Sequence, residues 1–471
     1  MKEYILRFRE HNFFPKIYIL LIALITFIES TKVVDIVGLQ WYYLSIINSL
    51  AFVYVLIRSK DTDQINSFST VIKNPFILFY SLFFLVSCLS LIFSINTATS
   101  VIALVKIINY LSILYLIFFF NIFKKIDSSF IIILFTISLL AEVWSSMGGY
   151  FFLIGEEFEY EFKFASQYLL GVYPNKNITA MSIAFKIPFA IILFFRLKNK
   201  IVKTLLLVLL TVAYFNLIIL SARAIILSIS ISIIFIIVGL IVIKFLDKKK
   251  FNFVSINLLK YLAPIIISVS YSSYKFSGTE ASLTNRFNSI NIEKADEGIK
   301  YFKGELGEDD LAKERLASYN FEKKSLLKSS VSSRKRFYTK GLNYFKENPL
   351  MGSGIGNYQL TAIDMDSKNI LSYIVPYVAH NDFIELLVET GFFGFLCYLL
   401  FTLSIPFFLI KSFFLTKDHE SRLFCLILSL PYFIYFIDSN INFPHYRPAI
   451  QISLILYSYI VFSFYKKIRI N

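Results

Sequence analysis

The sequence predicts an all-α membrane protein with about twelve transmembrane helices and one large external loop between the ninth and the tenth. Three observations support this fold class. Of the 471 residues, 56% are hydrophobic and only 17% are charged, whereas soluble domains carry about 25% charged residues. Apolar runs of about 20 residues, long enough to cross a bilayer core, recur along the whole chain. Basic residues also cluster in alternate connections between these runs, which excludes a soluble protein of about three domains.

The twelve expected spans fall into a group of nine before a long polar segment and a group of three after it. We place them at residues 15–30, 37–57, 76–95, 101–123, 128–146, 178–195, 203–221, 223–243, 254–273, 391–410, 422–438 and 448–465. The division gives three regions. Residues 1–274 hold spans one to nine behind an N-terminal tail, residues 275–382 form the external loop, and residues 383–471 hold spans ten to twelve and a C-terminal tail.

The distribution of charge fixes the expected orientation. With the N-terminus in the cytoplasm, the cytoplasmic segments hold 23 basic and eight acidic residues, and the short external segments hold five basic residues. This asymmetry follows the positive-inside rule and predicts that both termini are cytoplasmic. The cytoplasmic face then carries the entire net charge of +15. The basic composition therefore indicates topology and attraction to anionic lipid, and does not call for a nucleic-acid partner.

Two external segments follow from this topology. The loop 275–382 contains 16 basic and 14 acidic residues, and an apolar pattern from Phe337 predicts a helix that ends at Asn348-Pro349. The glycines of residues 352–356 then indicate a tight turn or a close approach to a ligand. The second segment, residues 147–177, carries an acidic cluster at Glu156, Glu157, Glu159 and Glu161. This cluster suits either a divalent cation or a solvated loop, and it shows no ligand spacing pattern.

His380 is the candidate general base. It lies outside the membrane in this topology, in Ala379-His380-Asn381-Asp382, where Asn381 or Asp382 can cap the helix that becomes the tenth span. A histidine at the membrane surface can take a proton from a hydroxyl group, because its ordinary pKa is near 6.5. The alternative is an interfacial histidine with structural hydrogen bonds.

Basic residues in unusual settings are the candidate anion ligands. Arg223 sits between two apolar runs, where it either extends to the outer headgroups or binds an anion such as phosphate in a bidentate fork. Arg334 belongs to an external basic triplet, which suits an anionic ligand or a solvated face. Charged residues within the expected spans indicate that the bundle encloses a polar cavity; they are Lys106, Glu142, Lys186 and Glu389.

An ordered set of motifs then runs through the chain. Between Arg334 and Gly394 it comprises an aromatic residue at Tyr338, Asn-Pro-Leu-Met-Gly-Ser-Gly-Ile-Gly-Asn-Tyr at 348–358, His-Asn-Asp at 380–382 and Glu-Thr-Gly-Phe-Phe-Gly at 389–394. Supporting motifs are Asn-Lys-Asn ending at Asn177, Ser-Ala-Arg ending at Arg223, and Asn-Phe-Pro-His-Tyr-Arg-Pro around Arg447. This order resembles the O-antigen ligase and polymerase superfamily of bacterial membrane enzymes.

The resemblance implies transfer of a glycan from undecaprenyl diphosphate at the periplasmic face of the bacterial inner membrane. The acceptor would be lipid A–core for a ligase, or a second lipid-linked repeat for a polymerase. The family's histidine maps to His380 and its two arginines map to Arg223 and Arg334, although the family's Ser-Arg pair reads Ser-Ala-Arg in this sequence. Asn381, Asn177, Arg447 and Lys186 are expected to support the site.

The chemistry of the residues agrees with this implication. A glycosyl diphosphate already has a good leaving group, so the enzyme must hold the diphosphate charge and take one proton from the acceptor hydroxyl. We expect a single inverting step without metal or cofactor. A polysaccharide flippase or transporter is the alternative of another class, because it would also carry intramembrane charges. Such proteins more often show repeated halves, and no internal repeat is visible in this sequence.

Overall fold

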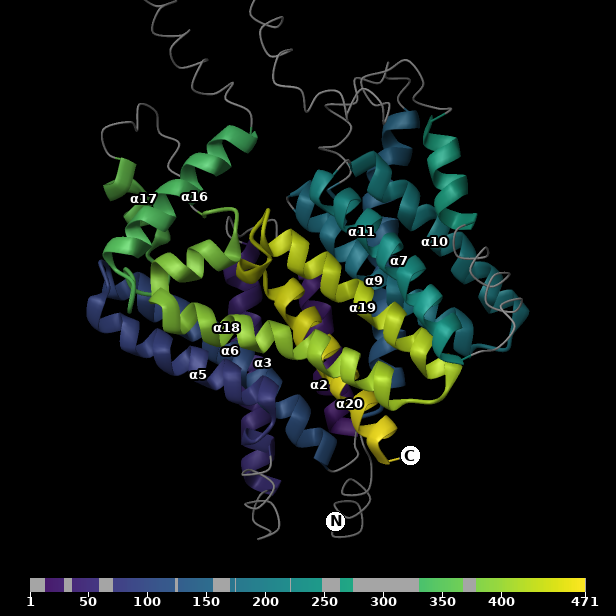
Figure 1. Cartoon of the computed structure of the whole chain (residues 1–471), viewed down its shortest axis with the longest axis horizontal. Coiled ribbons are helices and arrows are strands. Elements are labelled where there is room, and N and C mark those ends of the chain that lie inside the picture. The colour runs from purple at the N-terminus through teal and green to yellow at the C-terminus, as the bar shows by residue number, and fades with distance from the viewer. Residues whose placement is uncertain are drawn as a thin grey trace, which may run out of the picture.

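The computed structural model describes residues 13–28, 36–58, 71–122, 126–155, 170–173, 175–220, 222–247, 263–273, 330–366 and 378–470. Within these ranges every regular element is a helix, which confirms the all-α prediction (Figure 1). Ten helices in these ranges are long and apolar enough to cross a membrane. They are α3 (Ile36–Arg58), α5 (Pro75–Ser90), α6 (Thr97–Ile122), α7 (Ser128–Gly155), α9 (Lys176–Arg196), α10 (Lys200–Leu220), α11 (Arg223–Asp247), α18 (Asp382–Leu415), α19 (His419–Ser439) and α20 (Pro448–Ile470).

The two remaining predicted spans correspond to shorter helices among the described residues. The span expected at 15–30 is α2 (Phe13–Ala23) followed by the 3₁₀ helix η1 (Leu24–Phe27), a helical run of roughly 24 Å. That falls below the roughly 30 Å of a bilayer core. Of the span expected at 254–273, the described part is the helix Ala263–Ser273. The described residues therefore support ten spanning helices where the sequence predicted twelve.

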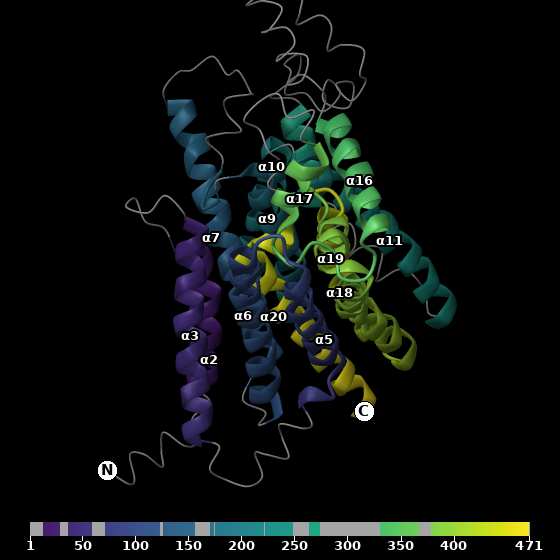
Figure 2. The same ribbon diagram turned by 90° about the vertical axis from the view of Figure 1, so that its left-hand side faces the viewer.

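Two helices form the centre of the bundle. The membrane-spanning windows of α9 and α20 are 89% and 83% buried inside the protein, far more than those of the other spans. Helices α7, α10 and α19 pack against α9, whereas α6 and α18 pack against α20, and α5 packs against α18 (Figure 2). Large apolar side chains remain exposed on the outer helices, including Leu50, Val105 and Phe245. This pattern suits lipid contact, because lipid replaces water around a membrane bundle.

The described part of the predicted external loop contains α16 (Ser330–Glu347) and α17 (Tyr358–Asp366). Both views place them at the end of the bundle opposite the C-terminal end of α20 (Figures 1 and 2). Helix α16 ends directly before Asn348-Pro349, as predicted, and packs against α18. Residues 274–329 lie outside the described residues.

The glycines of residues 352–356 form a turn that approaches the protein's own backbone. Gly352 has a φ of 64°, and a Cβ at this position would lie 2.2 Å from the carbonyl oxygen of Val388 in α18. The predicted tight turn is thus confirmed, and the close approach it allows at Gly352 is to α18. Gly391 of α18, with φ 66°, lies against the backbone of Leu350 at the start of the same turn. Helix α18 bends at Gly391, which explains why a helix beginning at Asp382 was predicted as a span from residue 391.

Candidate active site

Four segments that lie far apart in the sequence converge beside the start of α18. They are the N-terminal half of α16, the turn at residues 378–381, the end of α19 with the 3₁₀ helix η6 (Pro444–Tyr446), and the start of α9. Two hydrogen bonds join the first three at the carbonyl oxygen of Asn440. The Tyr338 hydroxyl lies 3.1 Å from it, and Asn381 Nδ2 donates to it at 3.1 Å.

His380 has an unusual backbone conformation. Its φ is 56°, which makes it the one described residue other than glycine with a positive φ. Histidine is among the few side chains that adopt this left-handed region at all, and strained residues of this kind cluster at functional sites. The next residue, Asn381, returns to an extended conformation and caps α18 by accepting hydrogen bonds from the backbone N–H groups of Phe383 and Ile384. The predicted capping role of Asn381 is confirmed.

The surroundings keep the His380 imidazole neutral at pH 7. Its pKa is lowered to about 4, first by burial and second by the positive charge of Arg334. The ring meets Phe443 edge to face at a centroid distance of 5.2 Å. Within the described part of the chain, its buried Nδ1 has no hydrogen-bond partner. A neutral, partly buried imidazole with a free nitrogen can accept a proton from a ligand.

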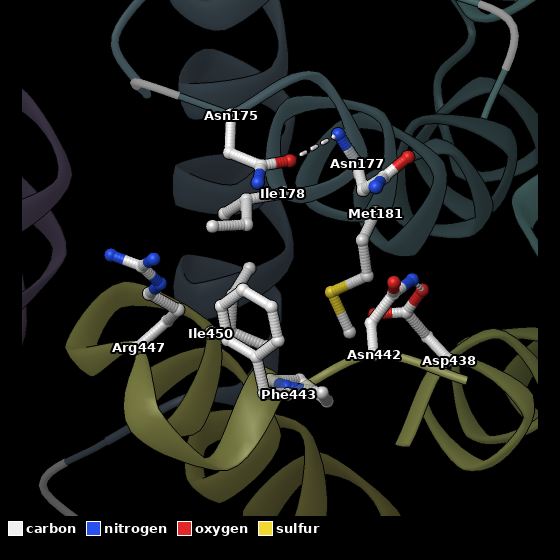
Figure 3. A pocket seen from close by; sticks show the side chains of 10 residues that line it. Asn175, Asn177, Ile178, Met181, Asp438, Asn442, Phe443, Arg447 and Ile450 are labelled. Atoms are coloured by element: carbon white, nitrogen blue, oxygen red, sulfur yellow. Dashed lines mark hydrogen bonds between the residues drawn. The ribbon is translucent and has the colours of Figure 1, made fainter. Parts of the chain in front are cut away.

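Phe443 also lines a small pocket (Figure 3). It is lined by the start of α9, with Asn175 and Asn177, and by the end of α19 and the start of α20, with Asp438, Asn442 and Arg447. The Arg447 guanidinium lies over the Phe443 ring at 5.3 Å from its centroid. Phe443 therefore contacts His380 and Arg447 together, so the base candidate and a cation border one aromatic ring.

Arg334 connects the pocket electrostatically to His380. Besides its effect on His380, its charge acts on Asp438, whose carboxylate accepts a hydrogen bond from Asn442 Nδ2. Arg334 lies one helical turn before Tyr338 on α16, and Tyr338 bonds the carbonyl oxygen of His380. The structure thus brings together Arg334, His380, Asn381, Asn177 and Arg447 among the predicted site residues. Asn177 lies in the first turn of α9, where its N–H donates to the Asn175 side chain at 2.8 Å.

Arg223 is the first residue of α11, and its side chain is exposed. Helix α11 runs antiparallel to α19, because Phe235 contacts Phe433 and Gly239 faces Leu426. The start of α11 is therefore at the same end of the bundle as Asp438. The causes of the His380 pKa shift are burial and Arg334, and Arg223 is not among them.

Lys186 lies away from the pocket. It forms a buried ion pair with Glu142 of α7 and also bonds Ser182 at 2.8 Å. Nine residues of helix separate it from Asn177, which is roughly 13 Å along α9. The same Glu142 accepts hydrogen bonds from Tyr173 and Ser182. The predicted polar interior exists, and two of its charged members, Glu142 and Lys186, are paired with each other.

The other two charged residues predicted inside the bundle, Lys106 and Glu389, lie near the glycine turn of residues 352–356. Glu389 accepts a hydrogen bond from the backbone N–H of Tyr358 at 2.9 Å, and the charge of Lys106 acts on it. Lys106 also lies 5.9 Å from the Trp41 ring. These contacts tie α6, α17 and α18 together beneath the site.

Sequence reasoning missed two residues at this site. Asp438 is the last residue of the predicted span 422–438 and lines the pocket. A carboxylate at the end of an apolar run indicates a polar cavity, and this signal could have identified Asp438 from the sequence. Glu385 was given no role from the sequence, yet it binds the turn that carries His380. The acidic cluster at Glu156, Glu157, Glu159 and Glu161 lies outside the described residues. Among the described residues, no group of three His, Cys, Asp or Glu side chains could hold a metal ion.

Comparison with known proteins gives one family. Residues 206–399 match the family model described as O-antigen ligase, which confirms the resemblance seen in the sequence. The matched region runs from α10 through α18 and contains Arg223, Arg334 and His380. No curated protein matches the chain. A family domain of this kind implies a multi-pass membrane enzyme for glycan transfer of the ligase or polymerase type, with a lipid-linked glycan as substrate.

Proposed function

We propose that this protein transfers a glycan from undecaprenyl diphosphate to lipid A–core at the external face of the bacterial inner membrane. The observation that carries the proposal is the position of His380: a neutral imidazole, influenced by the charge of Arg334, beside a ring that also contacts Arg447. The pair of arginines suits a diphosphate, because guanidinium groups bind phosphate oxygens in bidentate geometry.

In the proposed reaction, the acceptor hydroxyl oxygen attacks C1 of the donor sugar as His380 takes the hydroxyl proton. The C1–oxygen bond to the diphosphate breaks, undecaprenyl diphosphate leaves, and the configuration at C1 is inverted. General-base catalysis of this kind contributes about 10²–10⁴-fold. Arg334, Arg447 and Arg223 would hold the charge that the leaving group gains. In this scheme protein side chains alone take the proton and stabilise the charge of the leaving diphosphate.

The low pKa of free His380 suits this order of events. Arg334 is one of its two causes, and a bound diphosphate would offset that positive charge. The pKa of His380 would then rise when the donor binds, toward the value at which a general base is most effective. His445 is a weaker candidate for the base, because its Nδ1 is hydrogen-bonded to Tyr398 at 3.3 Å.

An apolar cavity supports a donor with a long hydrocarbon chain. It is lined by α9, α10, α11, the helix Ala263–Ser273 and α19, and its polar lining is limited to Tyr214 and Ser232. On α19, Leu430 and Ile434 of this cavity precede Asp438 of the pocket at helical spacing. On α9, Ala184 and Ile187 continue the face of Ile178 and Met181. The small pocket beside Phe443 and the apolar cavity thus follow the same faces of α9 and α19. A diphosphate in the small pocket would therefore place its prenyl chain in the apolar cavity.

The deciding experiment uses the purified full-length protein in proteoliposomes. The donor is an undecaprenyl diphosphate glycan, offered with lipid A–core or with a second lipid-linked repeat. We expect a product on lipid A–core, and a product only with the second repeat would instead identify a polymerase. Movement of the donor across the bilayer without transfer would favour the flippase alternative.

A further inference from the structure

A buried carboxylate holds the turn that carries His380. Glu385 lies in the first turn of α18 and is 1% exposed. Its Oε2 accepts a hydrogen bond of 2.7 Å from the backbone N–H of Ala379, the residue directly before His380. Ala379 is completely buried, so this N–H would lose its hydrogen bond without the carboxylate.

The backbone of His380 is held from both sides. On the N-terminal side Glu385 binds Ala379, and on the C-terminal side the Tyr338 hydroxyl lies 2.9 Å from the carbonyl oxygen of His380. Asn381 then caps α18. A residue other than glycine keeps a positive φ only where its surroundings over-determine it. These contacts are such surroundings, and Glu385 supplies the one carboxylate among them.

We propose that Glu385 is a positioning residue for His380: its carboxylate anchors the Ala379 peptide and thereby fixes the direction in which the imidazole points. The proposal rests on the function proposed above. Glu385 does not touch the reacting atoms in this scheme. Any side chain with an acceptor oxygen at the same place could accept the hydrogen bond from the Ala379 N–H. Glutamine supplies such an oxygen, whereas methionine has similar length and supplies none.

Glu389 provides a matched control. It lies one turn further along α18, is 2% exposed, and its Oε1 accepts a hydrogen bond from the backbone N–H of Tyr358. The Tyr446 hydroxyl interacts with both carboxylates. The two glutamates therefore share burial, helix and type of bond. They differ in the segment they hold, because Tyr358 starts α17 and Ala379 adjoins His380.

The experiment compares Glu385→Gln, Glu385→Met and Glu389→Met in the proteoliposome transfer assay. We expect Glu385→Met to lower kcat about 10–100-fold with little change in the KM for donor, because a small displacement of a catalytic group costs rate more than binding. Glu385→Gln should stay within about threefold of the wild type, and Glu389→Met should keep most of its kcat. Equal loss in both methionine variants, or equal loss in Glu385→Gln and Glu385→Met, would overturn the positioning role.

Hydrogen exchange separates this proposal from the function on which it rests. The amide of Ala379, followed by mass spectrometry on the purified protein, needs no transfer activity. It should be protected in the wild type and in Glu385→Gln, and should exchange at least tenfold faster in Glu385→Met. If the wild type transfers no glycan, the proposed function fails, while exchange still reports the anchor. Unchanged protection in Glu385→Met would overturn the anchor even in an active enzyme.

Discussion

The hydroxyl of Tyr338 lies between two carbonyl oxygens, 2.9 Å from that of His380 and 3.1 Å from that of Asn440. One hydroxyl proton is thus shared between the turn of His380 and the end of α19. Through this contact α16, which belongs to the predicted external loop, is attached to the pocket-lining end of α19.

Replacing Tyr338 with phenylalanine should loosen this junction. The variant loses a hydroxyl whose hydrogen bonds are worth about 0.5–1.5 kcal/mol, so we expect kcat for transfer to fall about two- to tenfold. Tyr344→Phe is the control, because Tyr344 lies on the same helix and its hydroxyl bonds Ser353 and not the His380 turn. An equal fall in both variants would show that α16 as a whole, and not the Tyr338 contact, determines the rate.

His380→Asn tests the base without disturbing the backbone. Asparagine adopts positive φ about as readily as any residue other than glycine, and His380 has φ 56°. We expect transfer to fall by about 10²–10⁴-fold while the melting temperature stays near that of the wild type. Thermal unfolding followed by size-exclusion chromatography provides the stability measurement. Retained turnover in this variant would remove His380 from the proposed mechanism.

The pH dependence of transfer should reflect the lowered pKa of His380. The neutral imidazole is the active form, so kcat/KM should rise with pH through about 4 and level off above it. In Arg334→Gln the loss of a nearby positive charge raises the pKa of His380, so the acidic limb should move to higher pH. The acidic limb of kcat should also lie at higher pH than that of kcat/KM, because bound diphosphate offsets the charge of Arg334 and so raises the pKa of His380. Rate profiles from pH 3 to 8 measure all three, and a downward shift in Arg334→Gln contradicts the assignment.

Arg223→Lys tests whether this exposed guanidinium binds the donor. Lysine keeps the charge and loses the bidentate fork, so we expect the KM for donor to rise roughly tenfold, the equivalent of one charge-assisted hydrogen bond. Arg196→Lys is the control, because Arg196 ends α9 and lies over the Phe424 ring, away from the pocket. An unchanged KM in Arg223→Lys would leave Arg334 and Arg447 as the donor ligands.

Exchanging the charges of Glu142 and Lys186 tests the buried ion pair. Glu142→Lys places two cations together in the bundle, and breaking a buried pair costs about 3–5 kcal/mol. We expect little folded protein from either single reversal and a substantial recovery in the double reversal. Fluorescence-detected size-exclusion chromatography measures the yield. A double variant as poor as the singles would mean that Tyr173 and Ser182, rather than the charge pair, determine stability at this position.

Much of the fold could be predicted because span length and apolar composition are local properties. The boundaries of α9, α19 and α20 lie within a few residues of those expected. The start of α18 was more difficult, because Gly391 bends the helix where its predicted apolar stretch begins, ten residues after its cap Asn381. The N-terminal span was overestimated, because η1 ends at Phe27 and hydropathy alone does not show a helix that stops early.

Candidate site residues could be identified from the sequence where a single ionisable residue stood out from its surroundings. His380 and Arg334 stood out as a histidine and an arginine in the predicted external loop, and in the structure the charge of Arg334 acts on the His380 ring. The partner of Lys186 could not be predicted, because only the three-dimensional packing of α7 on α9 shows that Glu142 pairs with it. Phe443 was present only within a motif, since no sequence pattern reveals that one ring contacts both His380 and Arg447.

The Glu142–Lys186 pair also constrains the biogenesis of the protein. Inserted singly, α7 or α9 would expose one charge to lipid, at about 2.5–3.5 kcal/mol for the centre of a helix. The cost disappears only when the two helices meet, because each charge has its counter-ion on the other. Insertion of α7 and α9 together would avoid this cost, and it would form the wall of the pocket at Asn177 in the same step.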